Sequence, residues 1–186
     1  MGKLTFILGG ARSGKSAHAQ RLAEKRGGRV TFLATATAGD DEMRARIVRH
    51  RSERPATWET REIPHGIAVA LQAAPLQADV VLLDCITLLV NNLFFIDGAD
   101  EPDESAVSLR VNAEIDALLA LVESNPAEWI VVSNEVGLGV VPPTPLGRVY
   151  RDLLGRANCQ LAAHAHQVLW MVAGIPVPIE QYRDAV

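Results

Sequence analysis

Residues 9–16 read GGARSGKS and have the residue types and spacing of a phosphate-binding loop. They satisfy the pattern G-x-x-x-x-G-K-[ST], between an apolar run and a helix-like segment. Glycines let the main chain wrap closely around phosphate oxygens and point its N–H groups at them. Lys15 is expected to reach the terminal phosphates, and the Ser16 hydroxyl is expected to ligate Mg²⁺. The segment therefore predicts a nucleoside triphosphate site that uses magnesium.

Two acidic residues follow later apolar runs. Asp84 ends the run VVLLD, where a carboxylate can hold Mg²⁺ beside a phosphate loop, although many strands end in Asp because a turn follows. Together with the phosphate loop, this position makes Asp84 a candidate metal ligand. Glu135, in SNEVG after the next run, could orient a nucleophile or hydrogen-bond the loop, and a structural role fits it equally well.

A single histidine stands in the arginine-rich segment DDEMRARIVRHRSERP, residues 40–55. On a helix, Met43, Ile47 and His50 fall on one stripe. The simplest interpretation is an amphipathic helix whose histidine ends the apolar stripe and whose arginines are solvated.

The arginines around His50 also permit a chemical interpretation. Arg46, Arg49, Arg51 and Arg54 would disfavour protonation of the imidazole by electrostatic repulsion. The same guanidinium groups suit phosphate oxygens geometrically. A neutral imidazole beside a triphosphate could attack phosphorus and form a covalent phosphoramidate. Spacing alone does not decide between the two interpretations.

Alternating elements are expected to position these residues. Continuous apolar runs are typical of buried parallel strands. Such runs occupy residues 3–9, 29–35, 79–85, 128–134 and 167–173, and IPVPIE after Gly174 is a candidate edge strand. Helical patterns occupy residues 15–27, 40–54, 64–74, 103–124 and 146–165, and the acidic segment 97–104 is expected to be a loop. The sequence therefore predicts an α/β fold with a doubly wound, mostly parallel sheet and helices on both faces.

Composition narrows the class of protein. A chain of 186 residues with 48% hydrophobic side chains predicts one domain, residues 1–186. A net charge of −4 argues against broad binding to nucleic acid, which needs a basic face. The cysteines, Cys85 and Cys159, form no metal or disulfide pattern, so a reducing cytoplasm is expected. No apolar stretch reaches the length of a membrane-spanning helix, so no membrane insertion is expected.

Five stretches of the chain resemble one known family. They are GGARSGKS (9–16), ATATAGDDEMRARIVRHRSERPATWETRE (34–62), LLDCITLLVNNLF (82–94), VVSNEVGLGVVP (131–142) and GRANCQLAAHAHQVLWMVAGIPVPIE (155–180). The chain resembles the bifunctional adenosylcobinamide kinase/adenosylcobinamide-phosphate guanylyltransferases of cobalamin assembly. The resemblance covers nearly the whole chain, and its most diagnostic parts are RI-x-x-HR-x-x-RP-x-x-W-x-T-x-E and NEVG-x-G-x-VP.

The resemblance implies two reactions on a P-loop (RecA-like) fold. The family phosphorylates the aminopropanol hydroxyl of adenosylcobinamide with ATP or GTP, and then transfers GMP from GTP to the resulting phosphate through a GMP-histidine intermediate. The matching position makes His50 the nucleophile. Relatives are oligomeric and often trimeric, which implies a homo-oligomer. The nucleotide contacts that the resemblance implies are Gly9, Gly10, Ala11, Arg12, Ser13, Gly14, Lys15, Ser16, Ala34, Thr35, Ala36, Arg51, Ser52, Glu53, Arg54, Glu62 and Asp84.

Two other functions remain compatible with the residues alone. One is a simple P-loop small-molecule kinase in which His50 and its arginines only bind phosphate. The other is a nucleotide-dependent regulatory module without transfer chemistry. Neither explains a resemblance that spans nearly the whole chain. The basis of guanine selection and the corrinoid-binding residues have no visible pattern in the sequence.

Overall fold

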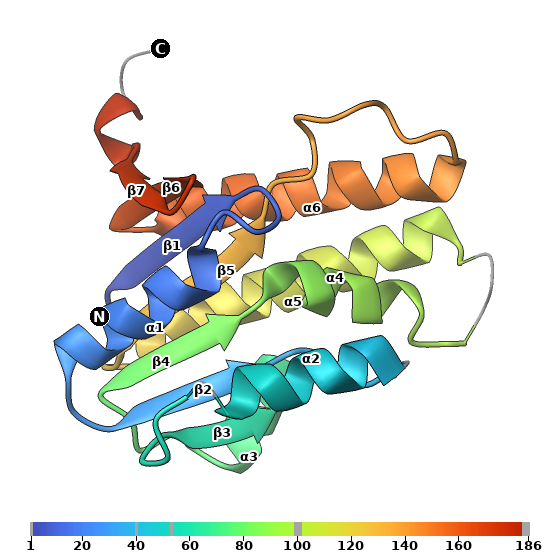
Figure 1. Cartoon of the computed structure of the whole chain (residues 1–186). Coiled ribbons are helices and arrows are strands. Elements are labelled where there is room, and N and C mark those ends of the chain that lie inside the picture. The colour runs from blue at the N-terminus through green and yellow to red at the C-terminus, as the bar shows by residue number, and fades with distance from the viewer. Residues whose placement is uncertain (1, 40, 53, 99–101, 184–186) are drawn as a thin grey trace.

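The computed structural model describes residues 2–39, 41–52, 54–98 and 102–183, without the side chains of Glu42, Met43 and Arg46. Seven strands form one sheet in the order β3-β2-β4-β5-β1-β6-β7 (Figure 1). Their bounds are β1 Leu4–Gly9, β2 Val30–Ala34, β3 Glu59–Glu62, β4 Val80–Asp84, β5 Glu128–Asn134, β6 Gln167–Val172 and β7 Ile175–Pro178. All neighbouring strands pair parallel except β6 and β7. The predicted mostly parallel sheet is confirmed.

Helices cover both faces of the sheet, which confirms the doubly wound arrangement. Figure 1 shows α1 and α2 in front of the sheet and α4, α5 and α6 behind it. Their bounds are α1 Lys15–Arg26, α2 Asp41–Ser52, α3 Ile67–Ala73, α4 Ile86–Phe94, α5 Glu104–Ser124 and α6 Pro145–His164, with a short 3₁₀ helix at Glu180–Tyr182. Among the described residues, no helix is both long and apolar enough to cross a membrane.

The two faces of the sheet carry separate apolar cores. On β1, Phe6 joins the core that contains α5 and α6, whereas Ile7 joins the core beneath α1. Both side chains are fully buried. Successive strand residues point to opposite faces, and here both faces are covered. This is why the central strands read as continuous apolar runs rather than alternating ones.

Besides the short 3₁₀ helix, two elements are absent from the sequence-based prediction. β3 has the sequence ETRE, and its side chains are exposed or half-buried at the edge of the sheet, so it lacks the apolar run that marked the other strands. α4 begins directly after Cys85, so only Asp84 and Cys85 separate its apolar residues from those of β4. Periodicity cannot separate such a helix from the strand before it.

The sheet order brings the predicted site residues to one edge. β1 lies between β5 and β6, and β4 lies between β5 and β2. The connection after β1 passes through α1 on the front face, whereas that after β5 passes through α6 on the back face (Figure 1). Open α/β sheets bind ligands outside the carboxyl ends of their strands, where neighbouring connections diverge in this way.

Candidate active site

The phosphate loop runs from the end of β1 to the start of α1. Gly9 has φ 156°, and a Cβ atom there would lie 2.6 Å from the main-chain oxygen of Met171. Gly14 caps α1 in the left-handed conformation with φ 92°. Both positions therefore require glycine. α1 begins at Lys15, so the positive end of its helix dipole is directed at the loop.

Lys15 is folded back over this loop. Its Nζ atom donates to the main-chain oxygen of Gly10 at 2.6 Å and lies 3.5 Å from the Ser13 hydroxyl. The side chain is only 7% exposed. A bound phosphate would therefore meet an ammonium group that is already held within the loop.

The hairpin between β6 and β7 supports the phosphate loop from the other side. The Gly174 N–H donates to the main-chain oxygen of Ser13 at 3.0 Å. A Cβ atom on Gly14 would lie 3.2 Å from Cα of Gly174. The last strand pair is thus part of the site, a contribution that no motif in the sequence indicated.

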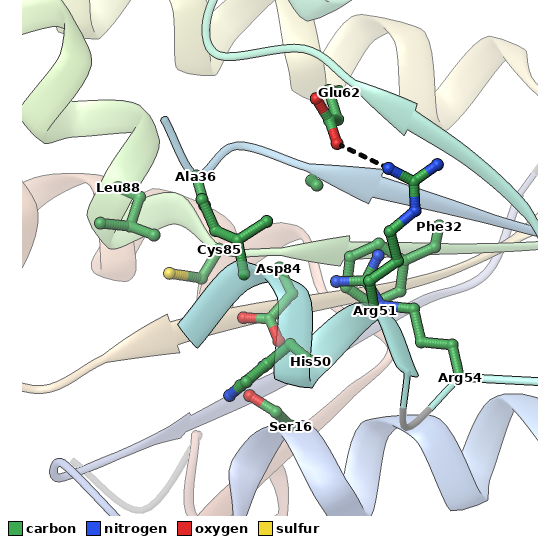
Figure 2. Close-up of a pocket in the computed structure, with 12 residues that line it drawn as sticks. Ser16, Phe32, Ala36, His50, Arg51, Arg54, Glu62, Asp84, Cys85 and Leu88 are labelled. Carbon is green, nitrogen blue, oxygen red and sulfur yellow. Dashed lines mark ion pairs between the residues drawn. The ribbon is translucent and has the colours of Figure 1, made fainter. Parts of the chain in front are cut away.

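One cavity joins the phosphate loop to the arginine-rich helix. Figure 2 shows the side chains of Ser16, His50 and Asp84 pointing toward one another. They come from α1, α2 and the end of β4, respectively. Twelve residues line this cavity: Ser16, Phe32, Ala34, Ala36, Ile47, His50, Arg51, Arg54, Glu62, Asp84, Cys85 and Leu88. The structure therefore brings together the predicted nucleophile and both predicted metal ligands.

The arginines around His50 occupy different positions. Arg51 and Arg54 line the cavity, whereas Arg49 is exposed and does not. The side chain of Arg46 lies outside the described part of the chain. Arg51 forms an ion pair with Glu62 at 3.6 Å, drawn as a dashed line in Figure 2. The cations beside the histidine therefore face a carboxylate from β3.

Arg54 is held against the floor of the cavity. Its guanidinium carbon lies 3.4 Å from the centroid of the Phe32 ring. Burial lowers the pKa of Arg54, and the neighbouring Arg51 lowers it further, while Asp84 and Glu62 act in the opposite direction. Its Nε atom is buried and has no hydrogen-bond partner within the described part of the chain. Because this atom is enclosed by protein, a phosphate in the cavity would have to use the terminal N–H groups of the guanidinium.

Ser16 and Asp84 offer a suitable pair of ligands for Mg²⁺. A hydroxyl and a carboxylate are hard oxygen donors, and protein-bound Mg²⁺ commonly takes one or two such ligands, with phosphates and water completing the shell. In the described residues, no group of three or more His, Cys, Asp or Glu side chains is arranged to hold a metal. The donor set therefore fits a nucleotide-bound magnesium ion better than a metal held by protein alone.

Several predicted contacts lie away from the cavity. Ala11 and Arg12 are exposed on the phosphate loop, and Arg12 has a positive φ of 57°. Ser52 is exposed and donates to the main-chain oxygen of Arg49 at 2.8 Å. Thr35 is fully buried and does not line the cavity, although Ala34 and Ala36 on either side of it do. Glu53 lies outside the described residues.

Glu135 takes part in the turn after β5. Its side chain accepts a hydrogen bond from the Gly137 N–H, and its own N–H donates to the main-chain oxygen of Gly9 at 3.0 Å. Together these contacts join the turn to the start of the phosphate loop. The structural interpretation of Glu135 accordingly has direct support.

Comparison with known proteins identifies the family of the chain. Residues 5–179 match the model of the family described as cobinamide kinase / cobinamide phosphate guanyltransferase. The bifunctional adenosylcobalamin biosynthesis protein CobU of Escherichia coli (strain K12) is 44% identical over 95% of this chain and 99% of its own length. The protein of the same name from Salmonella typhimurium is 40% identical over 95% and 99%.

A third relative extends the comparison to another genus. The bifunctional adenosylcobalamin biosynthesis protein CobP of Pseudomonas aeruginosa is 43% identical over 94% of this chain and 96% of its own length. The resemblance inferred from the motifs is thereby confirmed over almost the whole sequence. The chain belongs to the cobinamide kinase / cobinamide phosphate guanyltransferase family.

Proposed function

We propose that the cavity at the carboxyl edge of the sheet carries both activities of the family, on one domain formed by residues 1–186. The enzyme phosphorylates adenosylcobinamide with ATP or GTP and then converts the product to adenosyl-GDP-cobinamide with a second GTP. The observation that supports this most directly is that Ser16, His50 and Asp84 line one cavity although they come from three separate elements.

His50 is the proposed nucleophile of the guanylyl transfer. A lone pair on its ring attacks the α-phosphorus of GTP, so that a P–N bond forms, the bond from the α-phosphorus to the bridging oxygen breaks, and pyrophosphate leaves. A phosphate oxygen of adenosylcobinamide phosphate then attacks the same phosphorus. The P–N bond breaks, the diphosphate linkage forms, and the imidazole is regenerated. This half-reaction is expected to show ping-pong kinetics.

The other residues of the cavity act on the charge of the triphosphate. Magnesium held by the Ser16 hydroxyl and the Asp84 carboxylate would neutralise phosphate oxygens and orient the nucleotide. Lys15 and the loop N–H groups bind the terminal phosphates, while Arg51 and Arg54 screen the approach of the imidazole lone pair. Glu62 can accept hydrogen bonds from ribose or base.

The test is the mass of the intact protein after incubation with GTP and Mg²⁺. Native protein should gain one GMP unit, and the adduct should be labile in acid and stable in base, as a phosphoramidate is. His50→Ala should gain nothing, whereas the matched control His65→Ala, at an exposed histidine, should be labelled like the native protein. Native protein that binds GTP without forming an adduct would leave a plain kinase as the better assignment.

The compartment and the assembly state complete the proposal. We infer a cytoplasmic enzyme, because the cytoplasm supplies both nucleoside triphosphates, and a homo-oligomer, with the trimer as the form that the resemblance implies. Leu138 and Val140 lie close together on the turn after β5, at 80% and 96% exposure, and neighbouring exposed apolar side chains suit an interface between subunits. Sedimentation equilibrium would measure the subunit number directly.

A further inference from the structure

Thr35 links the ends of two neighbouring strands at the site. It follows β2 directly and is fully buried. Its hydroxyl donates to the main-chain oxygen of Cys85 at 2.7 Å and accepts from the Cys85 N–H at 2.8 Å. Its own N–H donates to the main-chain oxygen of Asp84 at 3.3 Å. Through its hydroxyl and its own N–H, Thr35 thus binds three main-chain groups directly after the Asp84 side chain.

Asn92 extends this network to a third strand end. It lies on α4, and its amide Nδ2 donates to the main-chain oxygens of Thr35 at 2.7 Å and Pro64 at 2.9 Å. Its Oδ1 accepts a longer hydrogen bond from the Thr37 hydroxyl at 3.4 Å. Both donors of the amide are therefore used to hold main-chain carbonyls, on the connections that follow β2 and β3.

The network lies directly behind the lining of the cavity. Ala36, Glu62 and Asp84 line the cavity, and each lies within two residues of a main-chain group that Thr35 or Asn92 binds. Neither Thr35 nor Asn92 lines the cavity itself. Thr35 is among the nucleotide contacts that the resemblance implies, but its hydroxyl is engaged with Cys85.

The same contacts hold the chain where it departs toward His50. Residues 35–40 connect β2 to α2, and Asn92 binds this connection at Thr35 and at Thr37. Beyond α2 the chain is anchored by Trp58, which packs against the apolar core beneath α1. Asn92 therefore holds the connection at the N-terminal end of α2, whereas the C-terminal end is held by the Arg51–Glu62 ion pair, by Arg54 on Phe32 and by Trp58.

We propose that Asn92 and Thr35 are positioning residues for guanylyl transfer. Together they help to fix the position of the His50 side chain relative to the Asp84 carboxylate. The inference rests on the proposed function of His50. Ser16 and Lys15 belong to α1, which the network does not touch. Loss of the network should therefore slow attack by His50 far more than it weakens binding of the triphosphate at the phosphate loop.

The first experiment measures single-turnover labelling by GTP beside GTP affinity. Asn92→Ala removes both amide donors, and Asn92→Asp keeps the acceptor for Thr37 but turns a carboxylate toward two carbonyl oxygens. Both should slow labelling about tenfold or more while GTP affinity changes less than about twofold. The exposed neighbour Asn91 gives the matched control Asn91→Ala, which should label at the native rate.

Thr35 provides a test by conservative rescue. Thr35→Val keeps the shape of the side chain but leaves the N–H and carbonyl of Cys85 without their partner, whereas Thr35→Ser retains the hydroxyl. Labelling should fall with valine and return to within about threefold of native with serine. Equal rates for the two variants, or an unchanged rate in Asn92→Ala, would overturn the inference.

Amide hydrogen exchange separates this inference from the proposed function. In Asn92→Ala, exchange should rise about tenfold in peptides covering residues 35–39 and 63–66 and stay within about twofold of native in those covering residues 9–26. Native protein that forms no adduct would refute the role of His50, and the exchange comparison would still decide whether Asn92 holds these connections. Unchanged exchange in residues 35–39 would refute the positioning role even if His50 is labelled.

Discussion

Arg54 stacks on Phe32, with 3.4 Å between the guanidinium carbon and the centroid of the ring. Phe32 belongs to β2 and is only 1% exposed, so the ring is a fixed surface. A guanidinium group held flat against a rigid ring loses little freedom when it binds a phosphate. The contact with Phe32 therefore preorganises the Arg54 guanidinium group for phosphate binding.

The substitution Arg54→Lys tests whether this stacked geometry contributes to GTP binding. Lysine keeps the charge but loses the planar fork, so GTP affinity should fall about tenfold, or about 1.4 kcal/mol. Calorimetric titration would measure the affinity. The matched control is Arg49→Lys on the exposed side of α2, which should bind GTP as the native protein does. Equal losses in both variants would mean that the stacked geometry does not matter.

The pairing of Ser16 with Asp84 predicts a specific magnesium dependence. Chelation should stop both reactions, and Asp84→Asn should raise the Mg²⁺ concentration for half-maximal rate by about tenfold, because one anionic ligand is lost. Titration of Mg²⁺ at saturating GTP would measure the shift. Asp116→Asn, at an exposed position on α5, supplies the control. Superimposable titrations for the two variants would contradict metal binding by Asp84.

The cysteines should differ in reactivity. Burial, followed by the charge of Asp84, raises the pKa of Cys85 to about 12, whereas Cys159 is exposed. Because the thiolate is the reactive form, iodoacetamide at about pH 8 should alkylate Cys159 and spare Cys85. Peptide mass spectrometry would locate the label, and Cys159→Ser should remain unlabelled until it is unfolded in urea. Rapid labelling of Cys85 in folded protein would show that its environment is open.

The raised pKa of Cys85 predicts that the folded protein loses stability at alkaline pH. The folded pKa of Cys85 lies above its ordinary value near 9, so the unfolded state releases this proton first as the pH rises. The contribution of Cys85 to the free energy of unfolding is therefore complete below about pH 9. It declines toward pH 12, by at most about 1.4 kcal/mol per pH unit. Urea unfolding across this range would measure the slope. Cys85→Ala should reduce the slope of the free energy of unfolding against pH. An unchanged slope would mean that other groups cause the loss of stability.

Arg26 joins the end of α1 to two strands. It pairs with Glu128 on β5 and donates to the Thr5 hydroxyl on β1 at 2.8 Å. Arg26→Ala should lower the free energy of unfolding by about 1–2 kcal/mol, because both partners are half-buried or buried. Arg21→Ala, at an exposed position on the same helix, should cost less than about 0.5 kcal/mol. Urea unfolding of both variants is the measurement, and similar losses would contradict the prediction.

The sequence predicted the elements that have their own local signal. Five apolar runs became β1, β2, β4, β5 and β6, and IPVPIE became the edge strand β7. The sequence-based prediction missed β3 because an edge strand with the sequence ETRE has no apolar run. This strand is held by its parallel main-chain pairing with β2. The sequence-based prediction missed α4 because this short helix starts two residues after β4, with no glycine, proline or polar segment between them to mark a new element.

The site could be predicted residue by residue, but its layout could not. Motifs identified Ser16, His50 and Asp84 separately, and only the order of the strands shows that they share a cavity. The direction of the Thr35 hydroxyl depends on where β4 ends relative to β2, which is a long-range property. The support that Gly174 gives to the phosphate loop likewise depends on a contact between distant parts of the chain.

The interior position of β1 in the sheet, between β5 and β6, has a consequence for biosynthesis. Its partners, β5 and β6, end at Asn134 and Val172, whereas β1 itself is complete by Gly9. During translation the first strand therefore leaves the ribosome long before either neighbour exists. Until they do, an apolar segment stays unpaired, a condition that favours aggregation and calls for chaperones. The phosphate loop, although it is encoded first, is among the last parts of the enzyme to be completed.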